Sequence, residues 1–86
     1  MSTFYSEERG IYTRVVSNLM YSRQSIAAAQ SAFRAHCSVT VRPQGQGNVA
    51  VHVKPLGESA REPTQAVLEF WNFVLDTEAQ RRLAMS

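Results

Sequence analysis

Two runs of alternating apolar residues limit the possible folds of this chain more than any other feature. They cover residues 37–42 and 49–54, and in both a Cys or Val occupies every second position. Side chains two positions apart in a strand point to the same face, so each run presents one apolar face. The polar, glycine-containing segment 44–48 separates them, and Pro43 and Pro55 stand at their ends. This pattern predicts a β-hairpin.

A strand and a helix are predicted before the hairpin. Residues 11–19 are rich in β-branched and aromatic side chains, which favour a strand. Ser22 is a suitable N-cap for a helix that extends to about residue 35. Within that helix Ile26, Ala29 and Phe33 have the three-and-four spacing of an apolar stripe.

A second helix is predicted after the hairpin. Pro63 suits the first helical position. An amphipathic pattern follows, and we expect Asp76 and Thr77 to interrupt it, with Asp76 capping a short final turn. The apolar residues of this pattern are Val67, Phe70, Trp71, Val74 and Leu75.

This element order, β-α-β-β-α, predicts an α+β fold with a three-stranded sheet and two helices on one face. A right-handed crossover places the first helix on that face, and the second helix must return to cover the hairpin. By analogy with half of a ferredoxin-like unit, we expect the third strand in the middle. Residues 1–10 are predicted to be a flexible tail, and residues 11–86 a single domain.

Composition narrows the class of protein. Among 86 residues there is one cysteine, so no internal disulfide is expected, and the net charge of +2 comes from scattered basic residues. Residues 1–10 lack the apolar run of a signal peptide, and no segment approaches the roughly 18 apolar residues of a membrane span. We therefore expect a cytoplasmic protein without a membrane segment.

Catalytic chemistry is not expected. His36, Cys37 and His52 are the obvious candidates for a metal site or a nucleophile, but Cys37 should point inward and His52 outward. The carboxylates are spread without pairing, and no CxxC or HxxxH spacing occurs. We therefore predict no enzyme activity, no catalytic residue, no cofactor and no metal.

The last helix carries more apolar surface than one sheet can cover. Its apolar residues span roughly 220° of the helical wheel once Phe73 is included. We expect Phe73, with Leu68 or Trp71, to remain exposed as a partner surface. The alternative is that the N-terminal segment, with Phe4 and Tyr5, folds over these side chains.

The sheet offers a second attachment point. Neither the first nor the second predicted strand is heavily guarded by charge, and an unguarded edge can accept a strand from another chain. The outward face of the hairpin is expected to be mildly basic and polar.

Several segments resemble one protein family. Tyr21-Ser22, the stripe that follows, and the Val39/Val41 strand resemble the first half of the His-Xaa-Ser system protein HxsD family. Residues 69–76 (EFWNFVLD), followed by Arg81-Arg82, resemble its closing motif. The resemblance covers about residues 13–83 and implies an accessory protein beside radical-SAM enzymes that modify ribosomally made peptides. It marks Asn72, Asp76 and Arg81 as signature positions, for which capping of the helix end is the structural explanation.

These observations lead to a functional hypothesis with two alternatives. The leading hypothesis is a non-enzymatic accessory protein of peptide maturation that binds a radical-SAM enzyme or a precursor peptide. Its partner-binding residues would be Leu68, Trp71, Asn72, Phe73, Asp76 and Arg81. One alternative is a homodimerisation module. The other is a small nucleic-acid-binding protein that uses Arg34, Arg42, His52 and Lys54.

Overall fold

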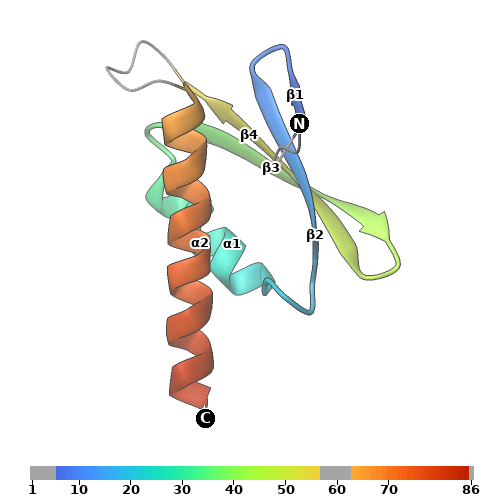
Figure 1. Cartoon of the computed structure of the whole chain (residues 1–86), viewed down its shortest axis with the longest axis vertical. Coiled ribbons are helices and arrows are strands. Elements are labelled where there is room, and N and C mark those ends of the chain that lie inside the picture. Colours follow the sequence, from blue (N-terminus) through green and yellow to red (C-terminus); the bar gives the residue numbers. More distant parts are fainter. Residues whose placement is uncertain (1–5, 57–62, 86) are drawn as a thin grey trace.

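Four strands and two helices make up the described part of the chain (Figure 1). The computed structural model describes residues 6–56 and 63–85. The sheet has the order β1-β2-β4-β3, and every neighbouring pair is antiparallel. The elements are β1 (Ser6–Glu8), β2 (Ile11–Ser17), α1 (Arg23–Ala32), β3 (Cys37–Gly45), β4 (Asn48–Pro55) and α2 (Pro63–Met85).

The predicted hairpin is confirmed. Its second strand, which is the third strand of the prediction, lies between the other two predicted strands, as expected. β3 and β4 are joined by a two-residue connection, because Gly45 pairs with Asn48. Both connecting residues, Gln46 and Gly47, have positive φ angles of 57° and 79°, as a type I′ turn requires. β4 lies between β2 and β3 and therefore forms the centre of the sheet.

The sheet has one strand more than the three predicted. Residues 6–8, which we expected to belong to a flexible tail, form β1 and pair with β2. The two-residue turn between them is again of the positive-φ kind, with Arg9 at 56° and Gly10 at 78°. A carboxylate oxygen of Glu7 accepts a hydrogen bond from the Gly10 amide at 2.8 Å and holds this turn. The α+β class is confirmed and the strand number is wrong.

Both helices pack on the same face of the sheet. Val39 pairs with Val53 and Val41 with Val51, so these side chains share a face. They meet α1 and α2 there in one hydrophobic cluster. Removing this apolar surface from water is the main force that holds the two layers together. The buried members of the cluster are Val16, Tyr21, Ile26, Ala29, Cys37, Val39, Val49, Val51, Val53, Ala66, Val67, Phe70, Trp71 and Val74.

The helix boundaries confirm one prediction and correct another. Ser22 is the N-cap of α1, and its hydroxyl accepts a hydrogen bond from the Ser25 amide at 3.2 Å. α2 is a single helix that passes through Asp76 and Thr77 without a break. Neither residue is a strong helix breaker, and the buried side continues beyond them at Glu78. No helix among the described residues has the length and apolarity needed to cross a membrane.

Candidate functional site

Trp71 lies in the core and not on the predicted partner surface. Its side chain is only 4% exposed. Tyr21 contacts its ring edge-to-face at 6.0 Å between ring centroids. The guanidinium of Arg14, on β2, stacks over it at 4.7 Å from the ring centroid. A strand and a loop distant in sequence therefore cover Trp71, which the helical wheel alone does not reveal.

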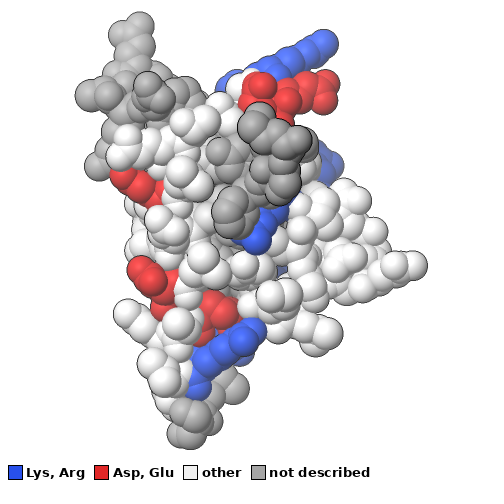
Figure 2. Space-filling view, in the orientation of Figure 1, with Lys and Arg blue, Asp and Glu red and all other residues white. Residues whose placement is uncertain are grey.

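Among the described side chains of α2, four other large apolar ones are exposed, one of which is Leu83, near the end of the helix, at 75%. Leu68, Phe73 and Leu75 are 45%, 37% and 43% exposed. Leu68 and Leu75 lie two turns apart on one flank, whereas Phe73 lies on the other and packs edge-to-face on Phe33 at 5.7 Å. In Figure 2 the face that includes α2 is mostly uncharged, with acidic side chains along this helix and basic ones toward its C-terminal end. The apolar excess is therefore divided between two flanks. Phe4 and Tyr5, the proposed cover, lie outside the described residues.

The three signature positions do not meet in the structure. Asn72 and Asp76 are exposed and lie one turn apart on the solvent side of α2. Arg81 points to the opposite side, where its Nε donates to Oε1 of Gln24 at 3.1 Å. The capping role expected for Asp76 does not occur, because the helix does not end there.

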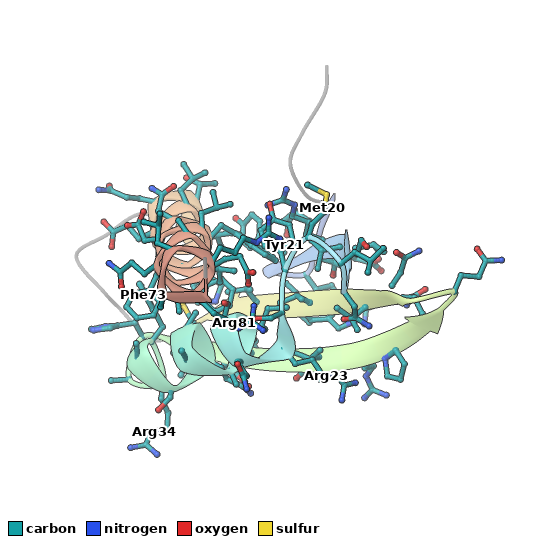
Figure 3. All side chains as sticks on the ribbon, turned by 90° about the horizontal axis from the view of Figure 1, so that it is seen from below. Met20, Tyr21, Arg23, Arg34, Phe73 and Arg81 are labelled. Atoms are coloured by element: carbon teal, nitrogen blue, oxygen red, sulfur yellow. The ribbon has the colours of Figure 1, made fainter. Side chains whose placement is uncertain are left out.

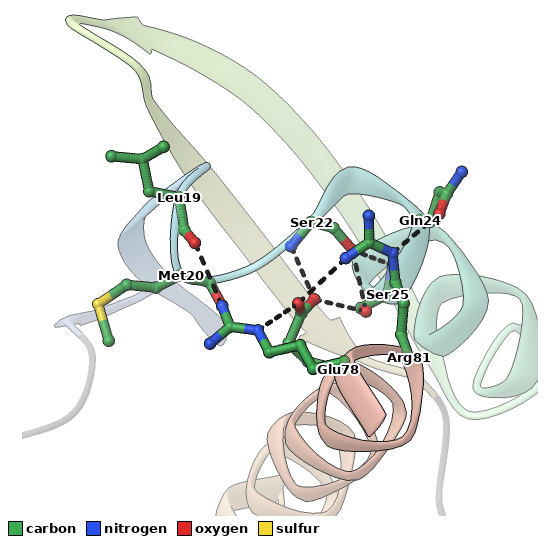
Figure 4. A network of polar contacts seen from close by, with 8 residues as sticks. Leu19, Met20, Ser22, Gln24, Ser25, Glu78 and Arg81 are labelled. Carbon is green, nitrogen blue, oxygen red and sulfur yellow. Dashed lines mark hydrogen bonds and ion pairs between the residues drawn. The ribbon is translucent and has the colours of Figure 1, made fainter. Parts of the chain in front are cut away.

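Glu78, which the sequence patterns did not single out, is the centre of a polar network (Figure 4). Its Oε1 accepts from the Ser22 amide at 2.9 Å and from the Ser25 hydroxyl at 2.8 Å. Its Oε2 accepts from Arg82 Nε at 2.9 Å. The Ser22 amide first, and then the Ser25 hydroxyl, lower the pKa of Glu78 from 4.5 to about 2. Glu78 therefore stays ionised and joins α2 to the start of α1.

The sequence position of Glu78 indicates that its side chain is buried. It follows Val67, Phe70 and Val74 at the same three-and-four spacing, so it lies on the buried side of the helix. A carboxylate at such a position requires hydrogen-bond donors from another element. Arg82 adds to the junction, because its Nη2 donates to the carbonyl oxygens of Leu19 at 3.2 Å and Met20 at 2.9 Å. The hydrogen bonds of Glu78 and Arg82 therefore join α2 to the start of α1 and to the loop before it.

A groove runs between α1 and β3 on the edge of the molecule. It consists of two adjoining hollows of about 460 Å³ and 250 Å³, which share Ala27 and Gln30. The larger also contacts Val39 and Leu56, and the smaller contacts Val41. The groove is lined by both polar and apolar side chains. Ala27 lies where the two hollows meet, and Val39 and Val41 line one hollow each.

The outer edge of β3 opens onto this groove. Within the described residues β3 is the last strand of the sheet on its side. Gln30 Nε2 donates to the carbonyl oxygen of Val39 at 2.8 Å, which shows that the Val39 backbone points outward. Because outward and inward backbone groups alternate in an antiparallel ladder, the N–H and C=O of Val41 point outward too. An incoming strand would find these groups at the edge.

The charges around the groove have one sign. Arg23 contacts the smaller hollow and Arg34 the larger. In Figure 3 both arginines lie on the side of α1 that faces away from α2. Both are exposed, and neither forms an ion pair with a described residue. None of the described residues that line the groove is acidic.

The other face of the sheet separates the remaining candidate residues. His52 lies there, and its Nδ1 is 2.8 Å from the Thr13 hydroxyl. Arg42 and Lys54 share this face and are exposed, whereas Arg34 lies beyond the end of α1. The four basic residues of the nucleic-acid alternative therefore do not form one surface.

Cys37 is buried on the helix-covered face, so it is separated from His52 by the sheet, as predicted. Burial raises the pKa of its thiol, which disfavours the thiolate needed by a nucleophile or a metal ligand. Within residues 6–56 and 63–85, no group of three or more His, Cys, Asp or Glu side chains is placed to hold a metal ion.

No protein-family model matches this sequence, and no match was found among curated proteins or among solved structures.

Proposed function

We propose that this protein is a non-enzymatic accessory protein that binds an extended peptide segment, which adds as a strand to β3. The observation that supports this function is an outer strand whose free edge opens directly onto a groove lined by α1. Strand addition of this kind obtains affinity from main-chain hydrogen bonds and specificity from pockets for alternate side chains. The α1–β3 groove supplies both.

The geometry suits an extended peptide better than a folded partner. A strand added to β3 would place alternate side chains over the groove and the others beside the open face of the sheet. The main-chain partners would be the Val41 N–H and C=O, and the Val39 carbonyl after the Gln30 side chain moves aside. The Gln30 amide donates to this carbonyl oxygen in the free protein, and a backbone N–H of the incoming strand would replace it.

The setting of the proposed function comes from the sequence resemblance and not from the geometry. The resemblance to the His-Xaa-Ser system protein HxsD family suggests a role beside a radical-SAM enzyme. The bound segment would belong either to a precursor peptide or to that enzyme. The exposed flanks of α2 at Leu68, Phe73 and Leu75 remain available for a second contact with the enzyme.

A pair of variants at Val41 tests strand addition. Proline at this position removes the outward N–H without removing a bond to β4, and alanine shortens the same side chain but keeps the N–H. The variants Val41→Pro and Val41→Ala would be titrated calorimetrically with a precursor peptide and a radical-SAM enzyme of the kind of cassette that the resemblance implies. We expect Val41→Pro to bind about fivefold more weakly than Val41→Ala, because one main-chain hydrogen bond is worth roughly 1 kcal/mol.

Two results would contradict the proposal. One is that neither the peptide nor the enzyme binds the wild-type protein. The other is equal affinity of the two variants, which would show that the edge of β3 makes no main-chain contact. Urea unfolding of both variants serves as the control, since both must be folded under the titration conditions.

A further inference from the structure

The two arginines of the groove are separated by a distance that an extended peptide can match. Arg23 is the first residue of α1, and Arg34 lies two residues beyond its last residue, Ala32. At 1.5 Å per residue the helix Arg23–Ala32 rises about 14 Å between the two arginines. An extended chain covers the same distance in about five residues. Each arginine contacts one of the two hollows, so the pair brackets the groove.

The residues between the arginines have a different character. Ala27 is small and lies where the two hollows meet. Ile26 and Val41 line the hollow near Arg23, and Leu56 lines the one near Arg34. A segment that follows this groove therefore meets a positive charge at each end and small or apolar side chains in between.

We infer that the peptide bound along β3 carries an acidic residue at each end of a stretch of about five residues, with small or apolar side chains between them. This inference rests on the proposed function and defines the chemistry of its ligand. Arginine is well suited to this recognition because its planar guanidinium can bind a carboxylate through two hydrogen bonds. No described acid of the groove competes for either arginine.

The same charges disfavour a second copy of this chain as the occupant. Two copies that paired along β3 about a twofold axis would bring their α1 helices side by side and antiparallel. Arg23 of one copy would then approach the partner's Arg34, and the two like charges would repel. An acidic peptide meets no such opposition.

A peptide-display selection tests the inference. The full-length wild-type protein would be immobilised and exposed to a random peptide library, in parallel with the Arg23→Glu/Arg34→Glu variant and with Lys54→Glu as a control. Lys54 is exposed on the open face of the sheet, so its reversal changes the overall charge without changing the groove. Arg23 and Arg34 are also exposed, so their reversal should leave the fold intact.

We expect the wild-type protein and Lys54→Glu to enrich peptides with acidic residues at the two ends of a stretch of about five residues, because a spacing of about four positions keeps both side chains on the groove side of the added strand. The double variant should lose this preference and select basic residues at those positions. Affinity of a selected peptide for the wild-type protein should also fall as salt is added, because the anchors are exposed.

Two outcomes would overturn the inference, and they differ in what they say of the proposed function. Enrichment of apolar peptides without acidic anchors, whose binding is still weakened by Val41→Pro, would refute the charge preference and leave strand addition standing. Failure to enrich any peptide, together with no binding of the precursor peptide or the enzyme, would refute both.

Discussion

At the scale of single residues, Glu78 is a buried carboxylate that is held by hydrogen bonds from two helices. Its carboxylate receives donors from the start of α1 and from the following turn of its own helix. A buried carboxylate is stabilising only when its oxygens are fully hydrogen-bonded, and Glu78 meets that requirement. It fixes the angle between the helices, and therefore the position of α1 beside β3.

The stability of the protein should depend on the ionisation of Glu78. Because the folded pKa of about 2 lies below the ordinary value of 4.5, the contribution of this carboxylate is complete above pH 4.5 and is lost as the pH falls toward 2. We expect Glu78→Gln to lower the free energy of unfolding by about 1.5 to 3 kcal/mol at neutral pH. The free energy of unfolding of this variant, measured with urea between pH 4.5 and 2 (the acid limb), should fall less steeply with pH than that of the wild type.

Asp76→Asn is the matched control, since it removes an exposed carboxylate from the same helix. Its effect at neutral pH should stay within about 0.5 kcal/mol. A Glu78→Gln variant with the same acid limb as Asp76→Asn would show that the network does not stabilise the fold.

Residue-level prediction from sequence succeeded where the determinants are local and failed where they are not. The Ser22 N-cap depends on a hydroxyl and an amide three residues apart, and it was predicted correctly. The burial of Trp71 depends on Arg14 and Tyr21, which reach it from another strand and a loop. A helical wheel of α2 cannot show the contacts of Trp71 with Arg14 and Tyr21, because both residues lie outside the helix.

At the scale of elements, α2 divides its aromatic residues between core and surface. Phe70 is fully buried among the sheet valines, whereas Phe73 is 37% exposed and contacts Phe33 on α1. The expectation that Phe73 is incompletely covered agrees with this exposure. α1 shields one flank of α2, so the helix pair covers more apolar surface than the sheet alone.

Alanine substitutions at the two phenylalanines should have unequal costs. Phe70→Ala creates a cavity in the core and should destabilise the protein by about 3 to 5 kcal/mol. Phe73→Ala loses only a partly buried ring and should cost about 1 to 2 kcal/mol. Thermal and urea unfolding would measure both, and equal costs would contradict the assignment of Phe70 as the core residue of α2.

The elements themselves were predictable to different degrees. The β3–β4 hairpin has strict alternation and a glycine-containing connector, so its strands were found. β1 was missed because its three residues are polar and its turn is Arg9-Gly10, which lacks the Asn-Gly or Asp-Gly signal usual for a type I′ turn. The groove was also missed, because it requires α1 to lie beside β3 with Gln30 on its edge.

At the scale of the whole molecule, β1 and β3 are the outer strands of the described sheet, and β3 is the one that opens onto the α1 groove. The free edge of a strand can pair with a second copy as readily as with a peptide, unless charge opposes it. Here Arg23 and Arg34 oppose self-pairing in the antiparallel arrangement. Under the proposed function, we therefore expect a hetero-complex through β3 and not a homodimer.

Sedimentation equilibrium would test this expectation. We expect the protein without its ligand to remain monomeric at micromolar concentration and low ionic strength, where repulsion between the arginines is least screened. A stable dimer that is dissociated by Val41→Pro and not by Val41→Ala would make a second copy of the chain the occupant of the groove.

The exchange of the Val41 amide hydrogen shows most directly whether β3 accepts a peptide strand. It would be followed by NMR in the free protein and in the protein saturated with the precursor peptide. If the peptide adds as a strand, this outward N–H acquires a main-chain partner and its exchange slows markedly on binding. A saturated complex in which the amide exchanges at its free rate, while the methyl signals of Leu68 and Leu75 shift, would place the peptide on α2 instead.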